Sequence, residues 1–474
     1  MKTPFLVWIC YFCLSLHPLW GQDFLPIQQD TSEKPFFVIQ GFIIEGNEKT
    51  KKHIITRELD FKVGDTLYVA ELDDLFQKNA NQIINTRLFN EVQLENQPID
   101  YQKSYIRIIL SERWYTFPVP TFELADRNFN EWWQDRDRDL SRTIMGIRFY
   151  QFNMRGRGEK LKAVAQLGFM EKLELFYDFP YIDKNLKYGM SLAASYSRAK
   201  QIPYTIASDK LVFHADDDYI RSRFYSGVQF FNRKGIFDYH RFELMYHQNE
   251  IGDTISQLNP NYFGSGNTRQ QYFRLSYLFE KDTRDLRYYA LNGSHALLRI
   301  NQLGVGIFGN LNMTVLSGQY RRFRPLNERF FWSASASFRL STPSQQPFFN
   351  ESGLGYEQNF VRAYELEVIN GQHYLLQKNN LRYKFLDFVI RDLKYVPIKK
   401  FSTIPIAAYL KLYADFAYLD LRNPTMESNF NNQLLMGYGL GLDLVTFYDF
   451  VFRFEYSFDR NFRNGFFLHF ESEL

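Results

Sequence analysis

Apolar and polar residues alternate one by one through most of the chain after residue 114. In the last hairpin Phe452, Phe454 and Tyr456 share one face, while Arg453 and Glu455 belong to the other. Such alternation is typical of a β-strand whose two faces lie in different surroundings. The pattern predicts sixteen strands, an even number that suits a barrel with both chain ends on one side. They lie near 115–124, 141–154, 159–170, 172–182, 187–200, 218–233, 236–251, 269–283, 293–304, 311–324, 329–341, 373–386, 405–419, 434–447, 449–459 and 465–474.

The composition narrows the class of β-protein. Aromatic residues make up 18% of the chain, yet the mean hydropathy is −0.37. No run after residue 21 approaches the ~20 apolar residues that a membrane helix needs. A large soluble all-β protein shares part of this profile, but one apolar and one charged face per strand suit a lipid-facing wall around a wet lumen. We therefore expect residues 114–474 to form a transmembrane β-barrel of about 16 antiparallel strands.

The lengths of the connections support a barrel with two different ends. The tight turns at 155–158, 183–185, 233–235 and 325–328 fall on one side, and most long connections, such as 252–268 and 342–372, fall on the other. Bacterial barrels keep their short turns on the periplasmic side. The segment 387–404 is an exception, because it is long on the side of the short turns, and the pattern does not explain it.

The first residues have the pattern of a secretory signal peptide. Lys2 supplies the charge, an apolar run follows, and Gly21 is a small residue before a cleavage point at the end of 1–21. Both cysteines, Cys10 and Cys13, lie inside this segment. The exported chain is therefore expected to carry no disulfide and no thiolate chemistry.

Residues 35–113 follow a different pattern from the barrel. A strand over 36–44 is followed by a short helix over 50–59 and a longer one over about 71–86, where apolar residues recur at helical spacing. Two further strands are predicted over 89–95 and 104–112. The order β-α-α-β-β predicts a small α+β domain with one modest core. It shows no catalytic constellation.

The long connection 342–372 is too apolar for a solvated loop. At its centre stands Val361-Arg362-Ala363-Tyr364, a single guanidinium flanked by bulky apolar side chains. A buried arginine needs a carboxylate, because an unpaired buried charge is very costly. Two interpretations remain open: a loop folded back into the barrel and anchored by Arg362, or a surface loop with a solvated arginine.

Other polar groups do not indicate a metal site or an enzyme. Asp135, Asp137 and Asp139 are spaced like the start of a calcium loop, but arginines alternate with them and no glycine follows, which favours a charge-balanced surface loop. The histidines show no ligand spacing, and no nucleophile–base arrangement or phosphate loop is present. The net charge of +3 does not suggest nucleic acid as a partner. We expect no catalytic residues, cofactor or bound metal.

Several short motifs resemble those of a known family. FKVGD at 61–65 and NTRLFNEVQL at 85–94, in the order of elements above, resemble a POTRA domain. Barrel motifs of the BamA/TamA family, also called the bacterial surface antigen family, are similar to 361–364, to Tyr413-Ala414-Asp415-Phe416-Ala417 and to Gly437-Tyr438-Gly439. A further match is Asp282-Thr283-Arg284-Asp285 followed by Gly293. Two positions depart from the family pattern, since Ala363 and Ala417 stand where the family has glycine.

The resemblance implies an assembly factor in the outer membrane of a Gram-negative bacterium, with its POTRA domain in the periplasm. Such a protein inserts outer-membrane proteins or moves substrates across that membrane without a nucleotide. Its partners would be membrane lipid, client polypeptides that meet the POTRA domain and the barrel, and accessory assembly proteins. The alternatives are a dedicated secretion pore that exports one partner protein and, less well supported by the motifs, a passive porin or receptor.

Parity along the strands predicts the partner of Arg362. Asp415 lies on the lumen face of its predicted strand, and Asp443 on the lumen face of the next. An infolded loop can reach both acids. We expect Arg362 to pair with Asp415, with Asp443 as the second candidate.

Two prolines mark the first predicted strand of the barrel. Pro118 and Pro120 lie two residues apart, so their missing N–H groups point toward the same neighbour. If they face the seam, defined here as the junction of the first and last barrel strands, only the closure of the barrel lacks hydrogen bonds. The alternative is that both prolines belong to a linker and that pairing begins near Thr121.

The final strand is predicted to direct the chain into the membrane. Phe466, Leu468, Phe470 and Leu474 share one face, as a lipid-facing last strand requires, although the family more often ends in an aromatic residue than in leucine. Deleting residues 465–474 should prevent insertion, because the exposed edge left behind cannot exist in lipid. Protease protection in outer-membrane fractions measures this. Recovery of an inserted, protease-resistant truncated barrel would contradict it.

Overall fold

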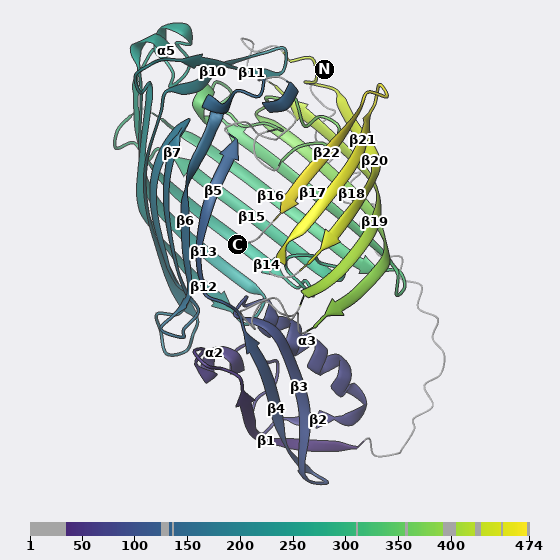
Figure 1. Cartoon of the computed structure of the whole chain (residues 1–474). Coiled ribbons are helices and arrows are strands. Elements are labelled where there is room, and N and C mark those ends of the chain that lie inside the picture. The colour runs from purple at the N-terminus through teal and green to yellow at the C-terminus, as the bar shows by residue number, and fades with distance from the viewer. Residues whose placement is uncertain are drawn as a thin grey trace.

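The computed structural model describes residues 35–124, 132–134, 137–309, 311–355, 359–391, 404–421, 428–446 and 449–471. The predicted signal peptide 1–21, Asp135 and Leu474 lie outside these residues. Two folded units follow one another along the chain, a small N-terminal domain and a large antiparallel sheet curled into a barrel (Figure 1).

The N-terminal domain is a four-stranded sheet in the order β2-β1-β4-β3, with helices packed on it. Its elements are β1 (Phe36–Glu45), α2 (Lys52–Thr56), β2 (Thr66–Tyr68), η1 (Val69–Glu71), α3 (Leu72–Ile84), β3 (Phe89–Asp100) and β4 (Lys103–Glu112). The apolar side of α3 and the alternating residues of β1 and β4 meet in one core that includes Ile39, Ile83 and Ile106. None of the described helices has the length and apolarity needed to cross a membrane.

The predicted α+β order is correct, and three details differ. The helix expected over 50–59 ends at Thr56, because the chain tightens there into a turn with the Glu58 N–H bonded to the Ile55 carbonyl at 3.0 Å. The strand β2 was not predicted, since three residues are too few to show alternation. The strand β3 continues through Pro98 to Asp100, because β3 is an edge strand, where a proline needs no partner on its open side.

The barrel sheet has sixteen antiparallel strands, as predicted. They are β5 (Thr116–Leu124), β6 (Thr143–Met154), β7 (Glu159–Gly168), β8 (Met170–Phe179), β9 (Tyr188–Ala199), β12 (Arg221–Lys234), β13 (Asp238–Ile251), β14 (Arg269–Asp282), β15 (Gly293–Leu303), β16 (Met313–Pro325), β17 (Phe330–Thr342), β18 (His373–Ile390), β19 (Ile404–Asp420), β20 (Leu434–Val445), β21 (Val451–Asp459) and β22 (Asn464–Glu471).

The wall of the barrel separates apolar from polar side chains residue by residue. In β19 Leu410 and Leu412 point outward and are 52% and 60% exposed, whereas Lys411 between them is buried on the lumen side at 3%. The alternation read from the sequence is therefore the alternation between the outside and the lumen, as a lipid-facing wall requires.

Two features of the connections were not predicted. No strand was predicted over residues 201–217, but β10 (Gln201–Ala207) and β11 (Lys210–Ala215) form a hairpin of their own there, and β9 pairs directly with β12. The puzzling segment 387–404 is partly strand, because β18 and β19 stay paired as far as Ile390 and Ile404. Residues 392–403 lie outside the described part of the chain.

The strands β5 and β22 are the two edges of the sheet, and no pairing joins them within the described residues (Figure 1). The backbone N–H of Phe152 bonds to the Tyr115 carbonyl at 2.7 Å, which makes these opposed residues a hydrogen-bonded pair. Alternate residues of β5 therefore bond to β6, and Pro118 and Pro120 face away from β6, toward the seam. The linker alternative is wrong, because β5 pairs with β6 from Thr116 onward.

The N-terminal domain is docked on one end of the barrel, called here the near end. The Glu58 carboxylate receives two 2.6 Å hydrogen bonds from Arg233 at the end of β12. Arg113 forms a second buried pair with Asp449 in the turn between β20 and β21, with N–O distances of 2.9 and 3.0 Å. The predicted tight turns lie at this end, since Arg57 bonds to the carbonyls of Leu186 and Gly235.

Replacing Glu58 with Gln should loosen this docking without unfolding either unit. Breaking one partner of a buried ion pair typically costs about 3–5 kcal/mol. Burial raises the pKa of the Glu58 carboxyl, but the neighbouring Arg233 lowers it by more, so the net pKa lies below its ordinary value. The pair therefore stabilises docking at neutral pH and is lost only as the pH falls through that depressed pKa.

Hydrogen exchange at the Lys51 amide, which bonds to the Gly156 carbonyl across the interface, measures the docking. A matched control is Glu45→Gln, which breaks an exposed pair with Arg107 and should change little. Equal exchange rates in the wild-type and Glu58→Gln chains would show that the pair does not hold the domain in place.

Candidate functional site

The long loop after β17 folds into the lumen rather than over the outer surface. Leu354, Val361, Tyr364 and Ile369 are buried and form one apolar cluster with the lumen-facing residues Leu376, Ala417, Leu419 and Leu435 of the wall. The surface-loop interpretation is wrong, because Arg362 is only 5% exposed. Burying this apolar surface against the wall stabilises the loop.

Arg362 pairs with Asp415 of β19, as predicted. Its Nε donates to one carboxylate oxygen at 2.8 Å, its second terminal nitrogen bonds to the other oxygen, and its own backbone N–H also reaches the carboxylate at 3.1 Å. The remaining nitrogen bonds to the Asn380 side chain at 2.7 Å and lies 3.3 Å from Glu455. The ring of Tyr413 lies 3.9 Å beneath the guanidinium. A buried charge with this many partners is compensated.

The second candidate, Asp443, belongs to a neighbouring network. It accepts from Lys411 at 2.8 Å, from Arg453 at 3.2 Å and from the Tyr289 hydroxyl at 2.9 Å. Lys411 also lies 2.8 Å from Glu455, so Glu455 joins the two networks. Sequence reasoning missed Glu455, although its place on the lumen face of β21 was readable from the alternation.

Two glycines of the wall allow close packing, Gly437 against the loop and Gly439 against the neighbouring strand. A Cβ at Gly437 would lie 1.8 Å from the Arg362 carbonyl oxygen, so the loop backbone lies directly against β20 at this point. At Gly439 a Cβ would lie 2.1 Å from the Tyr456 carbonyl oxygen. Ala363 adopts a φ of +78°, a conformation that favours glycine, and the carbonyl of the preceding Arg362 still lies against Gly437 with alanine there.

The motif of Asp282, Arg284 and Asp285 lies elsewhere, at the near end of the barrel. The Arg284 guanidinium donates two hydrogen bonds, of 2.7 and 2.8 Å, to the Asp282 carboxylate. The Asp285 carboxylate accepts hydrogen bonds from the Leu286 and Leu291 amides. The Asn85 side chain, just after α3, bonds to the Asp285 carbonyl at 2.9 Å. This motif shapes a turn that receives the N-terminal domain, and the structure does not bring it to Arg362.

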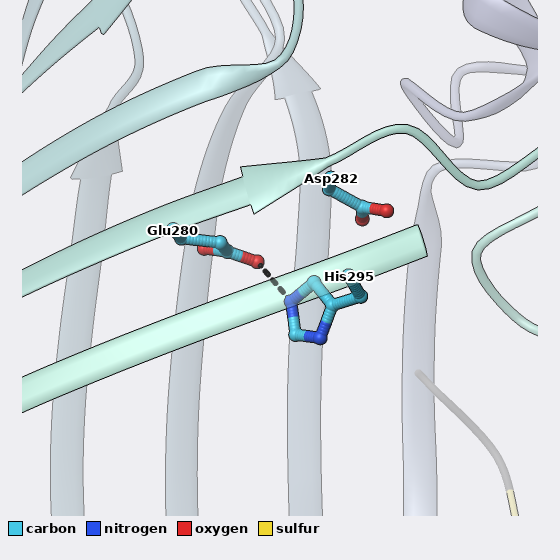
Figure 2. A group of neighbouring side chains, drawn as sticks. All are labelled: Glu280, Asp282 and His295. Carbon is cyan, nitrogen blue, oxygen red and sulfur yellow. Dashed lines mark hydrogen bonds and ion pairs between the residues drawn. The ribbon is translucent and has the colours of Figure 1, made fainter. Parts of the chain in front are cut away.

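Two histidines lie beside carboxylates that are distant from them in the sequence. Their spacing along the chain did not predict these contacts. His295 bonds to Glu280 at 3.0 Å, with Asp282 nearby (Figure 2). Asp282 is already neutralised by Arg284 and Arg287, at 2.7 and 3.1 Å, which opposes binding of a cation. We assign no metal to this group.

The second histidine connects the loop to the seam. His469 of β22 lies 3.2 Å from Glu365 of the loop and 3.4 Å from Glu455, and the Phe360 ring stacks on it at 5.5 Å. Glu455 already faces Lys411 and Arg362, so a bound cation is again opposed. The loop is thus in direct contact with an edge strand of the sheet.

The end of the barrel opposite the N-terminal domain, called here the far end, is spanned by the β10–β11 hairpin. Its tip residue Asp209 is 1% exposed and accepts the Asn429 amide at 3.1 Å, next to a bond from the Ser428 hydroxyl. The Val368 amide of the inner loop donates to the Asp209 carbonyl at 2.7 Å. This bridge across the lumen mouth was not predicted, because nothing near Asp209 in the sequence indicates its distant partners.

Replacing Arg362 with Ala should release the loop without unfolding the barrel. The change leaves Asp415 buried and unpaired, which costs about 3–5 kcal/mol, while the backbone ladder of the wall is untouched. Hydrogen exchange in residues 359–371 should rise strongly, and heat-dependent gel mobility should still report a folded barrel. Arg329→Ala, in an exposed turn, is the control. Unchanged exchange in the loop would show that the pair does not anchor it.

Comparisons with known proteins agree with this architecture. Residues 153–366 match the Omp85 superfamily domain, and residues 37–113 match the surface antigen variable number repeat, or POTRA. None of the curated proteins compared with the chain matches it in sequence.

Two solved structures are similar over most of the chain. BamA from Haemophilus ducreyi lacking POTRA domains 1–3 is 13% identical with a TM-score of 0.50, covering 92% of this chain and 84% of that one. CdiB from Escherichia coli is 10% identical with a TM-score of 0.52, covering 94% and 92%. At these identities the likeness concerns the fold. The two domain matches identify an Omp85 superfamily domain in this chain, preceded by a POTRA domain, and the likeness of fold agrees with them.

Proposed function

We propose that this protein inserts polypeptides into the outer membrane, or moves them across it, in the manner of the BamA/TamA type. Omp85 barrels are outer-membrane proteins of Gram-negative bacteria. The near end, with its tight turns and the docked POTRA domain, is proposed to face the periplasm, where clients arrive. The other partners of the proposal are membrane lipid and accessory assembly proteins.

The observation that carries the proposal is the unpaired edge. Within the described residues the sheet ends at β5 and β22 without a ladder between them. An unpaired backbone group in lipid costs several kcal/mol, so these edges favour a strand that pairs with them. An incoming client strand supplies those hydrogen bonds and is released into the membrane when its own barrel closes.

The two edges offer different numbers of donors. The Asp459 amide bonds to the Arg463 carbonyl at 2.9 Å, so parity directs the backbone groups of Leu468 and Phe470 toward the seam. On β5, Pro118 and Pro120 face the seam but have no N–H group to donate across it. The fuller edge is therefore β22, and we assign the client strand to it.

The POTRA domain has a second free edge for an arriving chain. In its sheet β3 is an edge strand of twelve residues and β2 is an edge of only three. A longer edge binds an extended peptide through more backbone hydrogen bonds. We assign the first contact with a client to β3.

The segments that occupy the lumen favour insertion at the seam over the alternative function, export through a dedicated secretion pore. The inner loop fills part of the lumen and is pinned by Arg362, and the hairpin tip at Asp209 spans the far mouth. Export through the lumen requires both to move, whereas insertion at the seam leaves the Arg362 network in place. The passive porin or receptor is less supported still, because neither needs an unpaired edge.

Locking the seam with a disulfide should abolish activity while leaving the barrel folded. Cysteines at Pro120 or Phe122 are combined with cysteines at Leu468 or Phe470, all outward-facing. The matched control joins Phe230 and Phe242, directly opposed and outward-facing on β12 and β13, where the ladder is permanent.

Cells are depleted of the wild-type protein, and their outer-membrane and secreted proteomes are compared under oxidising and reducing conditions. Loss of many barrels on locking supports insertion, and loss of one secreted protein supports the secretion pore. Efficient cross-linking along the whole seam with both proteomes unchanged would refute opening at the seam.

A further inference from the structure

The rim of the barrel is low at β15 and β16, midway along the sixteen-strand order from either edge. The strand β15 ends at Leu303, and the next amide, of Gly304, bonds to the Phe273 carbonyl at 2.9 Å. The neighbouring strand β14 continues past this level to Arg269. The loop joining β15 to β16 therefore starts beside a wall that rises above it.

Side chains on the outer face of this wall mark the level of the membrane boundary. Leu244 and Leu275 are exposed apolar residues of the lipid-facing belt. The next outward positions toward the far end are Tyr246 and Phe273, and beyond them Gln248, Gln271 and the exposed pair of Glu250 and Arg269. Aromatic residues between an apolar belt and a polar rim are the girdle of a membrane barrel.

The loop lies on the outer face at the level of this girdle. The Phe308 ring stacks on Phe273 with centroids 5.7 Å apart and lies 5.9 Å from Tyr246. Val305 and Ile307 are 40% and 64% exposed. The segment 304–309 contains no charged residue, so it presents apolar surface where the membrane begins.

Hydrogen bonds and packing hold the loop in this bent form. The outward side chain of Gln302 donates to the Gly304 carbonyl at 2.8 Å and to the Asn312 side chain at 2.9 Å. At the other end of the loop Leu311 packs with Met313 and Val315. Gly304 has a φ of +82°, and a Cβ there would lie 1.6 Å from the Leu311 carbonyl oxygen, so only glycine fits.

We propose that residues 304–309 are immersed in the outer leaflet of the membrane, with Ile307 and Phe308 in contact with lipid acyl chains. The surface is continuous with the lipid-facing belt, because a hollow of about 450 Å³ lies on the outer wall next to it, lined by Phe230, Phe242, Leu244, Leu275 and Ile300. The residues that line the hollow include one charged group, Glu243, which is paired with Arg274, and the segment 304–309 carries no charge. Acyl chains therefore fit this surface better than the polar rim of a soluble partner. The loop thus anchors the wall opposite the seam in the membrane.

Quenching by lipid tests the proposal. A bimane label is attached to Ile307→Cys in the full chain with Cys10 and Cys13 replaced by Ser, reconstituted in dioleoylphosphatidylcholine vesicles that contain lipid with a doxyl group near the headgroup. Ile300→Cys, in the belt, is the buried-in-lipid control, and Tyr101→Cys, 88% exposed in the POTRA domain, is the aqueous control. Val305→Cys provides a second loop position if Ile307→Cys folds poorly.

We expect the loop label to be quenched to within about twofold of the Ile300 label, and the Tyr101 label to be unaffected. Heat-dependent gel mobility confirms that each labelled barrel is folded. The proposal would be overturned if the labels at both loop positions showed the same emission and the same lack of quenching as the Tyr101 label. The loop would then be a water-exposed surface for a protein partner. This outcome is separate from the seam experiment, since either can fail alone.

Discussion

Backbone hydrogen bonding in lipid is the constraint on which the rest of the structure depends. A spanning strand has no water to satisfy its N–H and C=O groups, so each must pair with a neighbour. Fourteen of the sixteen strands have a neighbour on both sides, and only β5 and β22 lack one in the described sheet. The prolines of β5 reduce the cost of that opening, because a proline has no N–H to leave unpaired.

Buried side-chain charges in the lumen are subject to a similar constraint, because each needs an oppositely charged partner. Arg362, Lys411 and Arg453 face Asp415, Asp443 and Glu455, and each acid touches at least one cation. These groups come from the loop and from β19, β20 and β21, the last strands before the edge. Among these pairs Asp415 has Arg362 as its cation, whereas Asp443 and Glu455 each have two cations. Removing Arg362 therefore leaves a buried carboxylate without its cation, so the pair of Arg362 and Asp415 keeps the loop at a defined place inside the barrel.

The sequence predicts what depends on local periodicity and misses what depends on distant contacts. Sixteen strands, the lumen face of Asp415 and the shared orientation of Pro118 and Pro120 follow from alternation by twos, because that period is the geometry of a strand. The hairpin of Asp209 was missed because it pairs outside the barrel ladder. Glu455 and His469 were not recognised because their roles arise only when β21, β22 and the loop meet, which no local pattern records.

The docking of the POTRA domain limits the proposed opening of the seam. Arg113 leads directly into β5, and its partner Asp449 lies in the turn before β21, so their buried pair bridges the two sides of the seam at the near end. At the far end no such pair joins β5 to β22 among the described residues. An opening that leaves Arg113 and Asp449 together must therefore hinge at the POTRA domain and widen away from it. A client strand that arrives on the POTRA sheet would then meet the free edge of β22 at its narrow end and extend along it toward the wide one.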